Sequence, residues 1–305
     1  MKDVLFLNDS ISSKDEFEKG NRDEKHLRTE ILAGYDLYKD EFGCSQLGEL
    51  IIRPQHNKIT VGGLLYFLSQ AFGVEPDIKI ENLSEQYQIG LGTKSATVEA
   101  SKVCLFNVGL EGCGNSFADV REVLDQQNIV TDGMIPLRVV DVGADVKDNT
   151  RTDDGPYWMK KTTTTTVNGV EVTKDWYYAK QFEVDPNTGK SDIHIRSRWK
   201  DAEIGKDGTL VTDYPEQSLR TEGIESYVEI VARISAVDLR EYFEIYHEAS
   251  QSRFNSIGLC AGTKYMYEDG TCEYGDVKQI TVLNFSNEML HFEKDMSIIY
   301  RIYLT

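Results

Sequence analysis

The chain has 305 residues, of which 40% are hydrophobic and 10% aromatic, and its formal net charge is −18 at pH 7. This length and composition exclude an intrinsically disordered chain and allow one large domain or two ordinary ones with a sizeable core. The negative charge repels nucleic acid and anionic lipid, and no window holds the roughly 18 apolar residues of a membrane span. We therefore expect neither nucleic acid nor a membrane as a partner.

The N-terminal sequence MKDVLFLNDSISSKDE does not match a secretory signal, because one Lys and a short apolar run are followed by acidic residues. We expect the protein to be made, and to work or assemble, in a reducing cytoplasm. Its cysteines are odd in number and contain no C-x-x-C pair, which favours buried free thiols over a zinc site. Pairing of Cys104 with Cys113, or of Cys260 with Cys272, after exposure to an oxidant is left open.

Helical spacing of apolar residues occurs in three segments of the N-terminal part. The spacing predicts a surface helix over residues 23–41. A second helix is predicted over residues 60–72, with Thr60 as its cap and Gly73 as its stop. A third is predicted over residues 116–128, where Ser116 can cap the helix.

The plainest local signal is a hairpin in residues 162–184. A β-branched run meets Asn168-Gly169 and alternation then resumes, as a two-residue type I′ turn requires. Residues 193–199 read as a further strand. Residues 156–212 are therefore predicted to form a β-meander of long hairpins that projects from the body.

Strands are also predicted over residues 135–143, 226–235 and most of the last fifty residues. In residues 226–235 one face is wholly apolar and is expected to be buried. Residues 236–249 fit either a short amphipathic helix or a continued strand. The chain ends on a strand that we expect to be tied into a sheet, within the chain or across an interface.

These elements predict an α+β fold that is rich in β-structure, with antiparallel layered sheets or a sandwich, long hairpins, and a few helices mainly in the N-terminal third. The expected division is an N-terminal helical region over residues 1–75, a mixed α/β segment over 76–155, and a β-rich domain over 156–305.

Three glycine-containing segments share an apolar step before Gly-Leu: YQIGLGTKS (87–95), CLFNVGLEGCGN (104–115) and RFNSIGLCAGTKY (253–265). None has the Gly-Lys pair and following helix of a nucleotide-binding P-loop. We interpret all three as strands that end in tight glycine turns.

Catalytic and metal-binding motifs are missing from the sequence. It has no G-x-S-x-G, and its histidines are isolated. We interpret the acidic pairs Asp153 with Asp154, Glu225 with Glu229, and Asp238 with Glu241 as solvated faces, and DPNTGKSD (185–192) as a turn instead of a calcium loop. The sequence therefore predicts no catalytic residue, no cofactor and no metal site.

Aromatic residues and a hairpin tip are the candidate contacts with other chains. Tyr and Trp are enriched at protein interfaces, although internal packing would use them equally. The candidate interface residues are Trp158, Val167, Asn168, Gly169, Val170, Trp176, Tyr177 and Tyr178.

The order of several segments resembles baseplate wedge proteins of contractile-tailed bacteriophages. These segments are YQIGLGTKS, GMIPLRVVDVG, GPYWMKK, DWYYAKQFEV, FNSIGLCAG and ITVLNFSNEMLHFEKDMSIIYRIYLT, which span roughly residues 85–305. The C-terminal pattern is also similar to neck and collar proteins of tailed phages. The resemblance implies a mostly β protein without catalysis or cofactor, which works as a dimer among other wedge proteins. The N-terminal seventy residues depart from that pattern.

We therefore expect a non-enzymatic structural component of a tailed-phage virion, in the baseplate or in the neck or collar. It would be assembled in the host cytoplasm, would form a homo-oligomer such as a dimer, and would bind other virion structural proteins. The alternatives are a cytoplasmic enzyme with an acidic site, of the glycan hydrolase type, and a carbohydrate- or host-binding β-module.

Overall fold

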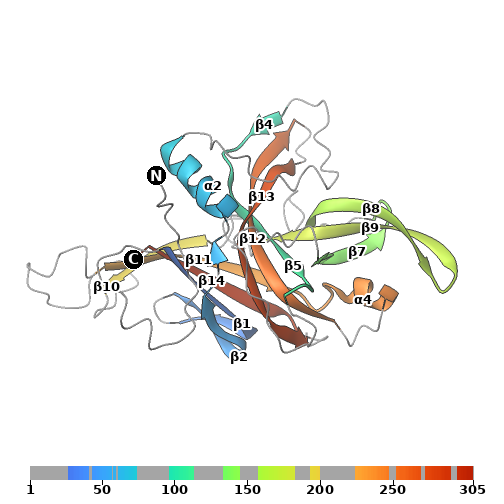
Figure 1. The fold of residues 1–305 in the computed structure, drawn as a ribbon, viewed down its shortest axis with the longest axis horizontal. Helices are drawn as coiled ribbons and strands as arrows, with labels where there is room; N and C mark the ends of the chain where they lie inside the picture. Colours follow the sequence, from blue (N-terminus) through green and yellow to red (C-terminus); the bar gives the residue numbers. More distant parts are fainter. Residues whose placement is uncertain are drawn as a thin grey trace, which may run out of the picture. The chain divides into compact units, whose positions relative to one another are not determined.

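Strands dominate the computed structural model, as Figure 1 shows. The structure describes residues 27–40, 43–56, 58–59, 61–73, 96–112, 133–144, 157–182, 193–199, 224–246, 252–268, 272–289 and 294–304. Every strand pair with a defined register is antiparallel. The prediction of a β-rich antiparallel fold is therefore confirmed.

The described chain forms two compact units that interleave in sequence, unlike the contiguous stretches expected from the sequence. The first unit combines residues 1–58, 192–232 and 297–305, and the second combines 59–191 and 233–296. The first unit holds a five-stranded sheet in the order β10-β11-β14-β1-β2. Its strands are β1 (Leu27–Lys39), β2 (Ser45–His56), β10 (Ile193–Trp199), β11 (Ile224–Ile234) and β14 (Met296–Leu304).

The predicted helix over residues 23–41 is wrong, because Leu27–Lys39 form strand β1 between β14 and β2. The β1–β2 pairing shifts register twice, once between Ile31 and Ala33 and again between Ala33 and Gly34. The added residue of each shift lies on β2, and β1 pairs with β14 without any shift. Residues 31–35 of β1 are all buried, so apolar residues occupy both faces of the strand and their spacing imitates that of a helix. Strands β1, β2 and β3 (Lys58–Ile59) lie within residues 1–75, where a helical region was expected, and among the described residues of that region only α2 (Val61–Phe72) is helical.

The second unit is built on a nine-stranded sheet with the path β3-β13-β12-β5-β9-β7, on which β4 pairs with β12, β6 with β5, and β8 with β9. Its remaining strands are β4 (Ala96–Val98), β5 (Lys102–Gly109), β6 (Met134–Ile135), β7 (Arg138–Asp141), β8 (Tyr157–Val167), β9 (Val170–Gln181), β12 (Arg253–Tyr267) and β13 (Cys272–Met289).

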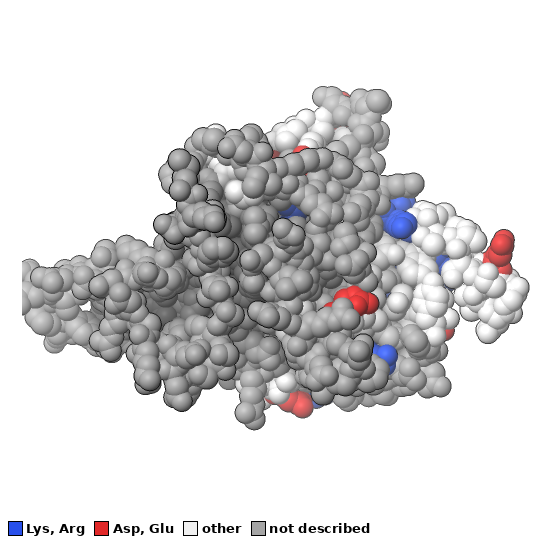
Figure 2. Space-filling model, viewed as in Figure 1, with Lys and Arg blue, Asp and Glu red and all other residues white. Residues whose placement is uncertain are grey.

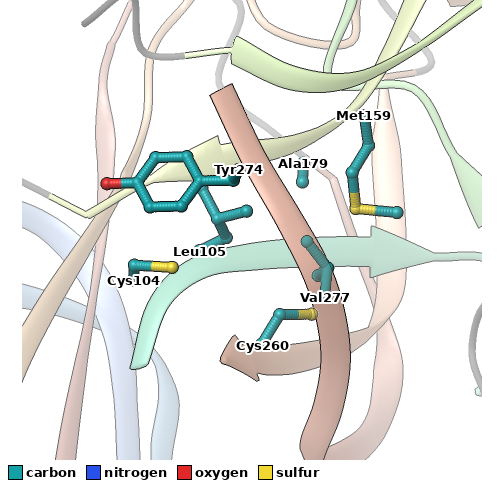
Figure 3. Packing of buried hydrophobic residues seen from close by; sticks show 7 residues of the cluster. All are labelled: Cys104, Leu105, Met159, Ala179, Cys260, Tyr274 and Val277. Carbon is teal, nitrogen blue, oxygen red and sulfur yellow. The ribbon is translucent and has the colours of Figure 1, made fainter. Parts of the chain in front are cut away.

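The core of the second unit lies where five of these strands meet. The cluster joins side chains from β5, β8, β9, β12 and β13, and Figure 3 shows them: Cys104, Leu105, Met159, Ala179, Cys260, Tyr274 and Val277. Cys104, Cys260 and Cys272 are buried free thiols, as the cysteine pattern predicted, whereas the free thiol of Cys44 is only half-buried and Cys113 lies outside the described residues. Burial raises the pKa of Cys104 to about 12, which keeps that thiol protonated and unreactive at neutral pH.

The described helices are α2 (Val61–Phe72) and α4 (Arg240–Tyr246), so helices are not confined to the N-terminal third. The second predicted helix is confirmed by α2, and α4 decides the open choice for residues 236–249 in favour of a helix. The predicted helix over residues 116–128 lies outside the described residues. Helix α2 packs closely on β13, since a Cβ added at Gly63 would lie 2.0 Å from the Ile280 carbonyl oxygen.

Two of the glycine segments are neighbouring strands of one sheet. In the β5–β12 pair, Asn107 lies opposite Gly258 and Gly109 lies opposite Ser256. Strand β5 ends at Gly109, as predicted, but β12 continues past Gly258, so the expected turn there is wrong. The third segment, residues 87–95, lies outside the described residues.

The predicted meander over residues 156–212 is wrong as a single unit. Strands β8 and β9 form the expected hairpin, and the φ angles of Asn168 (51°) and Gly169 (80°) confirm its type I′ turn. However, β10 pairs with β11 in the sheet of the first unit. Local alternation predicts that a segment is a strand, but its partner is chosen by packing across the whole chain.

Candidate functional site: the β8–β9 arm

The β8–β9 hairpin is called the arm from here on. Other strands pair with the arm on its β9 side, and only along its inner part. Strand β9 pairs with β5 at Lys180 and Gln181, and with β7 from Lys174 to Tyr177. The ladder with β8 continues further out to Val167 and Val170. The outer residues 164–173, called the arm tip, therefore extend beyond β7 (Figure 1), and no other strand in the described part of the chain pairs with them.

A buried ion pair anchors the base of the arm. The Lys180 ammonium lies 2.6 Å from a carboxylate oxygen of Asp238, and the Lys180 and Asp238 side chains are 9% and 0% exposed. The same carboxylate accepts a hydrogen bond from the Ser235 amide at 2.8 Å and another from the Tyr157 hydroxyl. Lys180 also lies 5.2 Å from the centre of the Tyr157 ring. Burial, followed by the charge of Asp238, raises the pKa of Tyr157, so its hydroxyl stays a donor.

A second buried carboxylate, that of Asp175, lies on the opposite side of β9. It accepts hydrogen bonds from the Thr162 hydroxyl at 2.6 Å and the Gly143 amide at 3.1 Å, and Lys160 lies 3.7 Å away. Burial by itself raises the pKa of Asp175, but these hydrogen bonds and the Lys160 charge together lower it. The carboxylate thus joins β8, β9 and the turn after β7.

Aromatic side chains of α4 cover the other face of the arm. The Trp176 ring lies 6.0 Å from that of Tyr242 and 5.9 Å from that of Tyr246, centre to centre. The Tyr246 hydroxyl is hydrogen-bonded to the Thr165 hydroxyl at 3.2 Å. Burial, and then the neighbouring Tyr242 and Tyr246, raise the pKa of Tyr178 to about 12. These contacts hold α4 against the arm.

The predicted contact residues separate into two groups. Trp176 is only 5% exposed and packs inside the unit, and Trp158, Tyr177 and Tyr178 are half-buried. Trp158 packs edge-on against Tyr274 at 4.9 Å. By contrast, Asn168, Gly169 and Val170 of the turn are exposed, and Val170 is 62% exposed. The aromatic residues thus build the base of the arm, and contact of the tip with a partner stays a prediction.

Glu229 and Asp238, which were interpreted from the sequence as parts of solvated faces, are buried carboxylates, so that interpretation is wrong for both. Glu229 is 0% exposed and Asp238 is 2% exposed. The sequence does contain an indication that Glu229 is buried. Tyr227 and Val231 lie on the same face of β11 as Glu229, so largely apolar side chains flank Glu229 along the strand. Asp153 and Asp154 lie outside the described residues.

Glu229 is the centre of a charge network within the first unit. It accepts a hydrogen bond from the Ser45 amide at 2.9 Å and one from the Arg301 Nε at 3.4 Å. Arg196 lies 3.8 Å and Lys39 3.9 Å from its carboxylate. The network ties the ends of β1 and β2 to β10, β11 and β14, so these charges hold the fold together.

Metal ligation has no candidate in the part of the chain that the structure describes, since no three His, Cys, Asp or Glu side chains there are arranged to hold an ion. His194 is half-buried on β10. No described helix has the length and apolar character that crossing a membrane requires. No family model, curated protein or solved structure matches this chain.

Proposed function

We propose that this chain is a non-enzymatic structural subunit that acts through protein–protein interfaces, and that the arm is one of its contact elements. The observation that carries the proposal is the contrast within the arm. Its base is fixed by the buried Lys180–Asp238 pair and by packing on α4, whereas the turn at its tip is exposed and no other described strand pairs with the tip.

An exposed tip on a fixed base is well suited to binding another protein chain. Association costs free energy when flexible segments become ordered, and a pre-organised element avoids much of that cost. The turn conformation is already fixed by Asn168-Gly169, and the cross-strand hydrogen bond between the Thr164 and Thr173 hydroxyls, at 2.8 Å, extends that order into the tip. The arm can therefore present its edge and turn to a partner at little entropic cost.

The buried carboxylates also support a structural function. Asp238 is shared by Lys180, Ser235 and Tyr157, and Glu229 is shared by basic side chains and a backbone amide in its own unit. Each is used to hold strands together. The sequence resemblance favours a tailed-phage virion as the assembly, at the baseplate or at the neck or collar, with further copies of this chain and other virion proteins as partners.

The test is to remove the arm tip and keep its base. Residues 164–173 are replaced by Asn-Gly, which can close the register pair Thr163 and Lys174 with a two-residue turn. The shortened chain should fold, with a circular dichroism spectrum and melting temperature near those of the intact chain. It should fail to be incorporated when it is the only copy present during growth of the virus. Normal particle yield with the shortened chain would refute the proposal.

A further inference from the structure

We propose that the free edge of β8 pairs with the β8 edge of a second copy, antiparallel and centred on Thr164, so that two arms form one continuous sheet. This inference rests on the proposed function and names the partner and the contact surface of the same arm. It follows from the direction of the main-chain groups, from the distribution of charge, and from an exposed tyrosine beside the edge.

The main-chain groups of every second residue of β8 point away from β9. A two-residue type I′ turn makes Val167 and Val170 the pair that exchanges both of its hydrogen bonds. Hydrogen-bonded and non-hydrogen-bonded pairs alternate along an antiparallel ladder. The amide and carbonyl groups of Thr162, Thr164 and Thr166 therefore face outward, and among the described strands only β9 pairs with β8.

The same three threonines have exposed side chains. They belong to an unbroken β-branched run without Pro or Gly, which suits a regular strand. Long, regular edge strands of this kind tend to pair with another strand. A twofold axis through Thr164 makes the edge complementary to itself, because Thr164 then faces its own copy and Thr162 faces Thr166 of the second copy. Every outward amide and carbonyl of the three residues gains a partner.

Charge along the arm favours this antiparallel arrangement. Lys160 and Lys161 lie at the base of β8, and Glu171 lies at the tip on β9. Figure 2 shows basic atoms towards the base of the arm and acidic atoms at its far end. The antiparallel pairing sets the basic base of each arm beside the acidic tip of the other. A parallel, in-register pairing would instead place like charges next to each other, which is destabilising.

An exposed aromatic side chain lies beside the same edge. Tyr246 is 45% exposed, although it packs on Trp176 and is hydrogen-bonded to Thr165. In the proposed register Thr165 lies opposite Thr163 of the second copy, on the face that α4 covers. The ring of Tyr246 then packs over the second copy's strand and loses part of its exposed surface, which is favourable.

The size of the contact sets the expected strength. Pairing over one strand edge buries less than the roughly 1,200–2,000 Å² of a stable complex. We therefore expect a reversible dimer whose population rises with protein concentration. Sedimentation velocity of the full chain over a concentration series, up to its solubility limit, measures this. A chain that remains monomeric throughout the series overturns the proposal.

A proline substitution identifies the edge. Thr164→Pro removes an outward amide that β9 does not use, and Pro is tolerated on edge strands, so the hairpin should persist. We expect this variant to be monomeric at concentrations where the intact chain dimerises. The matched control Thr164→Val keeps the amide and the β-branched shape and should dimerise like the intact chain. Equal dimerisation of the Pro and Val variants overturns the proposal.

Cross-linking gives a second readout that does not depend on the proline variant folding. In the proposed dimer the two copies of residue 164 have Cα atoms about 5.5 Å apart. The two copies of residue 173, three strand spacings apart at the same level of the sheet, are about 14 Å apart. A short thiol cross-linker should join Thr164→Cys chains but not Thr173→Cys chains, with the intact chain as the background control.

The outcomes separate this inference from the proposed function. Cross-linking at 173 as efficient as at 164, or a dimer that survives Thr164→Pro, would place self-association elsewhere and overturn the β8 edge alone. The structural function would then still be tested by the shortened arm. Normal assembly of the shortened chain would refute both.

Discussion

Replacing Asp238 by Ala should strongly destabilise the second unit. The change removes the carboxylate that pairs with Lys180 at 2.6 Å and accepts the Ser235 amide at 2.8 Å, and it leaves the Tyr157 hydroxyl without this acceptor. The Lys180 side chain is 9% exposed, so its ammonium group would stay buried without its counter-charge. Removing one member of a buried ion pair costs about 3–5 kcal/mol, and we expect a decrease of that size in the free energy of unfolding.

Two further variants assign this loss to the ion pair. Glu241→Ala breaks a pair with Lys174 that is equally short, 2.5 Å, but whose Glu241 side chain is 33% exposed. Because such pairs contribute little, we expect a loss below about 1 kcal/mol. Adding Lys180→Met to Asp238→Ala removes the uncompensated charge and should recover at least about 1 kcal/mol.

Denaturant unfolding followed by tryptophan fluorescence measures these effects. Trp158 and Trp176 belong to the second unit, and a Trp199→Phe background restricts the signal to them. The reasoning is refuted if Asp238→Ala costs no more than Glu241→Ala. It is also refuted if the double variant is no more stable than Asp238→Ala alone, because the loss of stability would then not come from the unpaired, buried charge of Lys180.

Three other properties can be tested directly. Gly63→Ala should lower the melting temperature, although Ala favours a helix by about 1 kcal/mol, because the new Cβ would lie 2.0 Å from the Ile280 carbonyl oxygen; an unchanged or higher value contradicts the close packing. The pKa of Asp175 is lowered from 3.8 on folding, so its ionised form stabilises the fold above that pH and the contribution is lost as the pH falls through the folded value. The difference in unfolding free energy between the intact chain and Asp175→Asn should therefore shrink between neutral pH and a pH below 3.8, and a constant difference speaks against it. Burial raises the pKa of Cys104 and of Cys260, so alkylation read by mass spectrometry should modify these thiols only after unfolding, whereas labelling of the native chain would show that the core opens.

The sequence by itself determined the features that depend on neighbouring residues. Asn168-Gly169 between alternating runs specified the turn and the pairing of β8 with β9, since only a few residue types adopt the positive φ angles of a type I′ turn. The apolar spacing of residues 61–72 likewise specified α2. The general β-rich character followed from the frequency of such local signals.

Only the tertiary structure decided which strands share a sheet and which charges are buried. The β1 segment is a strand because it lies between β2 and the distant β14, and burial of both its faces at residues 31–35 removed the alternation that would have identified it. Asp238 is buried because Lys180, 58 residues before it, folds back onto it, and Glu229 is buried because Arg301 and Ser45 do the same. Burial of a charge depends on a partner that compensates for lost hydration, and that partner is fixed only when distant segments pack together.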